Sequence, residues 1–102
     1  MANYSSKYGQ EINDSLNSRL KKLEQAAALA VTFIPKDATQ PAPSLEVMIQ
    51  KTTDKPDCLE MFQELAEEQP AASLKPQTVL TLLQRKIDEL RKAVAAMAEA
   101  SY

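Results

Sequence analysis

The stretch that decides the fold is the last quarter of the chain, Pro76 to Ala100, which reads PQTVLTLLQRKIDELRKAVAAMAEA. Its apolar side chains recur three or four residues apart, a spacing that places them on one face of an α-helix. The stripe is wide enough to fit both the relaxed helical period and the heptad of a coiled coil. We therefore predict a long amphipathic helix at about residues 76–100. The stripe consists of Leu80, Leu83, Ile87, Leu90, Val94 and Met97.

A second long helix is predicted near the start of the chain, at about residues 10–34. Its apolar residues again recur at intervals of three and four, from Ile12 to Ile34. Gly9 should weaken the helix before residue 10, since glycine costs about 1 kcal/mol relative to alanine in a helix interior. Pro35 should end the helix, because proline cannot continue the backbone hydrogen bonding of a helical turn.

In the middle of the chain, the sequence predicts a proline-rich linker at residues 35–43 and two short helices, at about residues 44–52 and 57–68. Ser44 is a suitable N-cap for the first short helix, and Asp57 with Glu60 resembles a capping box for the second. Residues 45–49 also alternate in polarity, which leaves open a short β-ribbon with residues 31–34. Such an isolated ribbon would be marginally stable.

Together these elements predict a single all-α domain over residues 1–102: a small helical bundle, or a helical hairpin of two long helices plus two short ones. A helix of 25 residues is about 37 Å long, whereas the two short helices span only about 20 residues. Part of a long apolar stripe should therefore remain uncovered within one chain, and exposed apolar surface usually marks an interaction site. A homodimer would cover it.

The composition argues against an enzyme and against bound cofactors or metals. The chain has no histidine, one cysteine and one glycine. It thus lacks the commonest general base and transition-metal ligand, and phosphate-binding loops need several glycines. Cys58 is interpreted as a core residue, although its place near a helix start could instead favour a reactive thiolate.

The charge pattern gives no indication of nucleic-acid binding. The net charge is −2, and the basic residues of both long helices are interleaved with acidic ones. Acidic residues instead gather on the second short helix, where Glu60, Glu64 and Glu67 follow helical spacing. They are interpreted as a solvated outer face, or alternatively as an acidic docking strip for a basic partner.

The resulting hypothesis is a cytoplasmic, non-catalytic protein–protein interaction module: an adaptor, a regulatory subunit or a small chaperone. The apolar stripe at residues 80–97 would bind a helical partner or a second copy of the chain, and Glu60, Glu64 and Glu67 would help to select that partner. No membrane, nucleic acid or small-molecule substrate is expected. The alternatives are a self-assembling structural subunit and, with less support, a DNA-binding regulator.

Overall fold

The chain forms four α-helices in the computed structural model, which describes the backbone of residues 2–37, 39–70 and 73–100. These helices are α1 (Ala2–Phe33), α2 (Leu45–Gln50), α3 (Pro56–Glu68) and α4 (Pro76–Ala100). No strand occurs in the described residues. The all-α prediction is therefore confirmed, and the alternative of a β-ribbon is wrong because residues 45–49 belong to α2.

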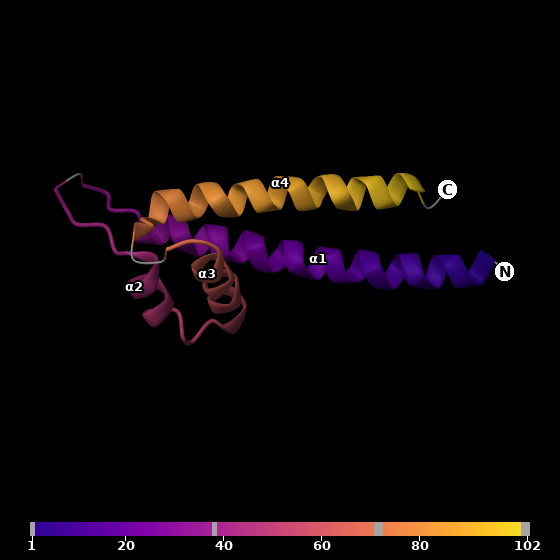
Figure 1. The fold of residues 1–102 in the computed structure, drawn as a ribbon, viewed down its shortest axis with the longest axis horizontal. Helices are drawn as coiled ribbons and strands as arrows, with labels where there is room; N and C mark the ends of the chain where they lie inside the picture. The colour runs from indigo at the N-terminus through magenta and orange to yellow at the C-terminus, as the bar shows by residue number, and fades with distance from the viewer. Residues whose placement is uncertain (1, 38, 71–72, 101–102) are drawn as a thin grey trace.

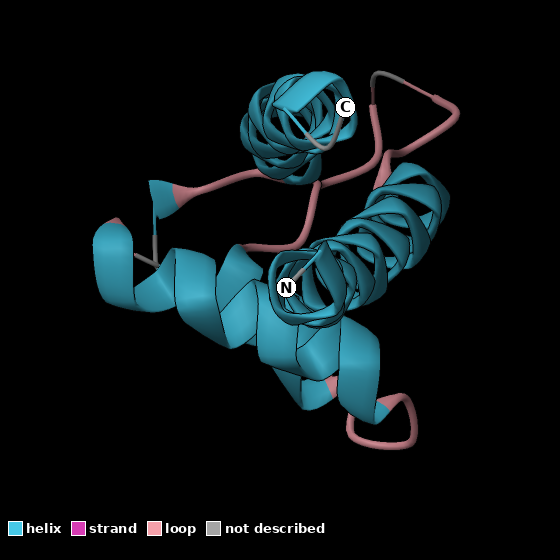
Figure 2. Cartoon of the chain, turned by 90° about the vertical axis from the view of Figure 1, so that its right-hand side faces the viewer, coloured by secondary structure: helices cyan, strands magenta, loops and turns pink. Residues whose placement is uncertain are grey.

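The two long helices determine the shape of the molecule. Helices α1 and α4 lie side by side and antiparallel, so that both ends of the chain are at the same end of the molecule (Figure 1). Helix α3 crosses them steeply near the other end, and α2 packs on α3 (Figure 2). The molecule is consequently elongated, measuring 61 × 23 × 21 Å along its principal axes.

Helix α1 begins earlier than its sequence pattern predicts, at Ala2 rather than at about residue 10. It continues through Gly9, whose cost of about 1 kcal/mol does not stop the helix. Extending an existing helix fixes only one residue per added hydrogen bond, whereas starting a new helix fixes several. At its other end α1 stops at Phe33, two residues before Pro35, as expected.

The starts of α2 and α4 agree with the predictions, whereas the start of α3 does not. Ser44 caps α2, because its hydroxyl accepts a hydrogen bond from the backbone N–H of Val47 at 3.4 Å. Helix α4 begins at Pro76 as predicted. The capping box at Asp57 is wrong: α3 begins one residue earlier, at Pro56, after Lys55, which makes no side-chain cap. Proline suits this first position because its missing N–H needs no partner.

The hydrophobic core lies at the end of the molecule where all four helices meet. Phe62 and Leu65 of α3 are almost completely buried there, in one apolar cluster with residues from the second half of α1 and the first half of α4. We call this region the head; it comprises residues 19–34, residues 45–68 (α2, α3 and the turn between them) and residues 73–87. The remainder of the two long helices, residues 2–18 and 88–100, projects beyond α3, and we call it the arm. None of the described arm side chains, residues 11–18 and 88–99, is buried.

Candidate partner-binding site

The structure divides the apolar stripe of α4 between the head and the arm. Leu83 and Ile87 belong to the head core, with exposed fractions of 0% and 7%, and Leu80 packs against that core. These three side chains are thus covered within the chain. The stripe continues into the arm at Leu90, Val94 and Met97, which are only partly buried, and of these Leu90 still packs against the edge of the head core. Of the six stripe residues predicted to bind a partner, these last three lie outside the head.

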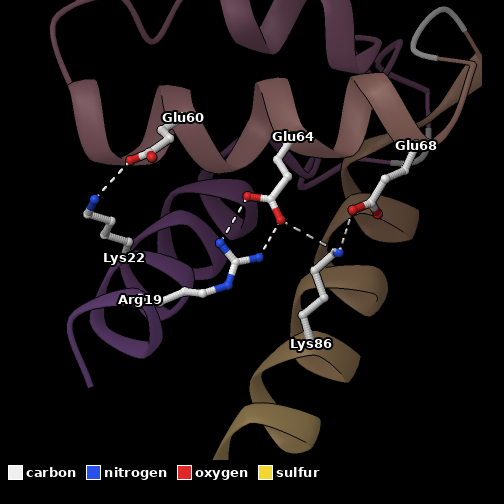
Figure 3. Close-up of polar contacts among 6 residues, drawn as sticks. All are labelled: Arg19, Lys22, Glu60, Glu64, Glu68 and Lys86. Carbon is white, nitrogen blue, oxygen red and sulfur yellow. Dashed lines mark hydrogen bonds and ion pairs between the residues drawn. The ribbon is translucent and has the colours of Figure 1, made fainter. Parts of the chain in front are cut away.

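Two of the three predicted acidic residues make ion pairs within the chain. Both terminal nitrogens of the Arg19 guanidinium donate to the carboxylate of Glu64, and the Lys22 ammonium donates to Glu60 at 3.0 Å (Figure 3). The predicted strip on α3 therefore faces the basic residues of α1. Glu67, the third predicted residue, is exposed on α3.

A further acidic residue, absent from the predicted set, links α3 to α4. The Lys86 ammonium lies 2.8 Å from a carboxylate oxygen of Glu68 and 4.0 Å from one of Glu64 (Figure 3). Glu68 follows Glu64 by four residues, and that spacing places it on the same helix face. We call these ion pairs the clasp; it consists of Arg19, Lys22, Lys86, Glu60, Glu64 and Glu68.

The clasp alters the protonation equilibria of its members. The hydrogen bond from Arg19 lowers the pKa of the Glu64 carboxyl, and Glu64 in turn raises the pKa of Arg19. The hydrogen bond to Glu60 raises the pKa of Lys22. Each charged form is thus favoured by its neighbour. The carboxylates of the clasp thus have cationic partners within the chain, whereas the predicted role of the acidic residues in selecting a partner stays a prediction.

The clasp also shows which side of the arm is left open. Arg19 and Lys86 point towards α3, so residues one, two and three turns further along each helix share that side. On α1 these positions hold Ser15 and Ile12. On α4 they hold Leu90, Ala93 and Met97. We call this surface, formed by Ile12, Ser15, Leu90, Ala93 and Met97, the arm face.

The arm face has no third helix to cover it among the described residues. In the head, α3 covers this side of the α1–α4 pair, and this coverage does not extend beyond the clasp into the arm (Figure 1). Ile12 consequently has an exposed fraction of 49%, and Ser15 and Ala93 are also exposed. The apolar spacing identified Ile12 as a core residue and did not single it out for binding, because spacing alone does not reveal which turns lack a neighbour.

A polar side chain in the arm is left without a hydrogen bond. The Oδ1 atom of Asn13 is shielded from solvent and has no hydrogen-bond partner in the described part of the chain. A buried acceptor without a donor normally destabilises a fold. The arm thus contains a shielded polar atom without a hydrogen bond. In the head, by contrast, the buried Thr52 hydroxyl donates a hydrogen bond to the carbonyl oxygen of Met48.

Cys58 lies in the head core, beside a second concave surface. Its side chain is 6% exposed, and burial raises the pKa of its thiol. The interpretation as a core residue is confirmed, and the raised pKa does not favour a reactive thiolate. The adjacent open groove between α1 and the start of α3 has a volume of about 480 Å³ and is lined by Gln25, Ala28, Leu29, Thr32, Lys55, Pro56, Asp57 and Cys58.

The fold and the arm face define the class of this protein as an all-α bundle whose two longest helices extend into an antiparallel two-helix arm. Comparisons with protein-family models, with curated proteins and with solved structures find no match. Among the described residues, no helix has the length and apolar character needed to cross a membrane. The same residues contain no cluster of three or more acidic or cysteine side chains suited to a metal ion.

Proposed function

We propose that this protein is a non-catalytic protein–protein interaction module that binds a helical segment of a partner on its arm face. The observation that carries the proposal is the partial exposure of Ile12, Leu90 and Met97 on a side of the α1–α4 pair that α3 covers only in the head. A third amphipathic helix placed there would repeat the packing that α3 provides nearer the clasp. Adaptors, regulatory subunits and small chaperones all work through contacts of this kind.

The head is the rigid support in this proposal, and the arm is the binding element. The core around Phe62 holds α1 and α4 at a fixed spacing, and the clasp holds α3 across both helices. The two arm helices are therefore presented as one preorganised surface, which reduces the ordering that binding would otherwise require. Compared with the sequence-based hypothesis, the proposed site moves from residues 80–97 of α4 alone to the arm parts of both long helices.

Site-specific photo-crosslinking in the cells that make this protein tests the proposal. A photoreactive amino acid at Ser15, on the arm face, should give discrete adducts with protein, because a partner would lie within reach of that side chain. Ile12→Asp in the same chain should abolish these adducts, since a charge on the arm face opposes apolar packing. The matched control places the photoreactive residue at Thr53, which is exposed in the head.

Two results would contradict the proposal. One is the absence of adducts at Ser15, and the other is the same set of adducts at Ser15 and Thr53. Circular dichroism of the purified Ile12→Asp chain should retain the helical signal of the wild type, because Ile12 lies outside the head core.

A further inference from the structure

Acidic residues border the arm face on both long helices. Glu11 precedes Ser15 by four residues, and Glu89 precedes Ala93 by four residues, so each carboxylate lies one turn away along the same side of its helix. The residue after each carboxylate is apolar and lies about 100° further round, towards the other long helix. Both carboxylates are exposed. They therefore form the two outer borders of the arm face.

The two border carboxylates, Glu11 and Glu89, have no cationic partner among the described residues. The cations at the head end of this surface belong to the clasp and are paired with α3. In the arm part of α4, Arg91 pairs with Glu24 at 3.7 Å, and Lys92 lies about 100° round the helix from the centre of the arm face. The arm face thus carries negative charge along both borders.

The head contains a third helix on this same side of the α1–α4 pair, and its charges match those of the surface that it covers. There the long helices contribute the three cations of the clasp, and α3 contributes the three carboxylates (Figure 3). Helix α3 combines these carboxylates with apolar residues such as Phe62, which is buried in the core. In the arm the border charges have the opposite sign, so a matching helix there carries cations.

We propose that the helical segment bound by the arm face is a basic amphipathic helix of a partner protein. Its apolar stripe packs on Ile12, Leu90 and Met97, and its lysine or arginine side chains pair with Glu11 and Glu89. The inference rests on the proposed function and names the chemistry of the partner. The bound helix lies along the arm, because the apolar residues of the arm face follow the two long helices, and one of its ends lies next to α3.

The arm limits the length of the bound helix and the spacing of its basic residues. Beyond Lys86, α4 extends about 21 Å at 1.5 Å per residue, which accommodates about 14 residues of a partner helix. Arg19 and Lys86 both contact Glu64, so they mark the same level along the molecule. Glu89 lies three residues beyond Lys86, and Glu11 lies eight residues before Arg19. The two basic contacts should therefore lie on opposite borders of the partner's stripe, about five residues apart.

Heteronuclear NMR titrations of the full chain test the charge of the bound helix. The probes are two synthetic peptides of about 14 residues that share one leucine stripe. They differ only in the residues that border the stripe, which are lysine in one peptide and glutamate in the other. At about 0.15 M salt we expect the lysine peptide to bind about tenfold more tightly and to shift the amide signals of the arm. Ile12→Asp should abolish this binding, because a charge on the arm face opposes apolar packing.

Charge reversal tests whether the two border carboxylates cause the preference. In the chain with both Glu11→Lys and Glu89→Lys, the glutamate peptide should bind about tenfold more tightly than the lysine peptide. The matched control combines Asp14→Lys with Glu99→Lys, which makes the same change in net charge on the same two helices. Both control positions are exposed, and each lies about 100° or more round its helix from the arm face. The control should keep the preference of the wild type, because salt screens distant charges.

Equal binding of the two peptides to the wild type overturns the basic partner, as does a preference that survives charge reversal or that the control also reverses. Failure of the lysine peptide to bind at about 1 mM overturns it too. If Ser15 still gives adducts with protein in cells, these results overturn the basic partner alone. A chain that binds neither peptide and gives no Ser15 adducts overturns the proposed function as well.

Discussion

The head and the arm are built from the same two helices, yet they bury very different amounts of apolar surface. Both contain apolar residues at intervals of three and four along α1 and α4. In the head, Leu23 and Leu83 are at most 1% exposed, whereas Ile12 in the arm is 49% exposed. The difference arises because α2 and α3 pack only around the head. The burial of an apolar side chain therefore depends on how many helices pack together at its level along the molecule. It does not depend on the apolar spacing of any one helix.

The first and largest test introduces the same charge into α4 on either side of the head–arm boundary. Ile87→Asp places an unpaired carboxylate in the head core and should cost about 3–5 kcal/mol of unfolding free energy. Val94→Asp, seven residues further into the arm, should cost less than half as much because its side chain already reaches solvent. Urea denaturation at low protein concentration measures both, and Lys92→Ala, on the exposed side, should change little. Equal losses for the two aspartates would remove the distinction between head and arm.

Thiol labelling compares the accessibility of the two regions. The buried Cys58 thiol has a raised pKa, so it should react with a thiol reagent only when the head opens. A second thiol introduced by Ser15→Cys should react at the rate of an exposed cysteine. We expect the rates to differ by about a hundredfold or more, which corresponds to an opening free energy of about 3 kcal/mol. Mass spectrometry of labelled peptides over time assigns each rate, and the difference should vanish in denaturant.

Replacing Asn13 tests whether the shielded side-chain oxygen in the arm lowers the stability of the fold. Asn13→Leu removes the shielded Oδ1 acceptor that has no donor among the described residues, and should raise the unfolding free energy by about 1 kcal/mol. Asn17→Leu changes an exposed amide in the same arm and should alter stability by less than about 0.5 kcal/mol. Thermal or urea unfolding distinguishes them. A loss of stability in Asn13→Leu would show that the asparagine is hydrogen-bonded in solution.

The smallest expected effect concerns the clasp at the boundary between the regions. Glu64→Gln should cost about 0.5 kcal/mol at neutral pH, because its ion pair with Arg19 is partly exposed and screened by solvent. The exposed Glu67→Gln on the same helix should cost nothing measurable.

The pH dependence follows from the lowered pKa of Glu64. Its usual value is 4.5, and the folded chain holds the carboxyl below that value. The stability that it contributes is fully present above pH 4.5 and is lost as the pH falls through the lower folded pKa. The difference in unfolding free energy between wild type and Glu64→Gln should accordingly be constant near neutrality and decline below about pH 4.5. A difference that does not change with pH would show that the clasp does not favour the ionised carboxylate.

Much of the fold was predictable because its signals are local. The prolines at 35 and 76 mark the end of α1 and the start of α4 within two residues, and Ser44 caps α2 as expected. The start of α3 was misplaced by one residue because Asp57 was assigned to the cap, whereas Pro56 already occupies the first helical position. Helix α1 was predicted too short because the local cost of Gly9 was given more weight than the cooperative extension of a helix.

The candidate site was predictable only in part. The stripe of α4 was identified, but its division at Ile87 depends on where α3 crosses, and no local pattern encodes that position. The acidic spacing on α3 was also identified, yet its neutralisation by α1 depends on contacts such as Arg19 with Glu64, which are 45 residues apart. Glu68 was detectable from its four-residue spacing after Glu64.

The sequence by itself determined which segments are helical, where they end, and which side of each long helix is apolar, because these properties follow from a period of 3.6 residues and from proline geometry. Only the tertiary structure decided which half of each apolar side is covered, and which charges are paired. Those outcomes depend on α3 crossing both long helices at one level. The result is a closed core on one side of that level and two partly exposed helices on the other.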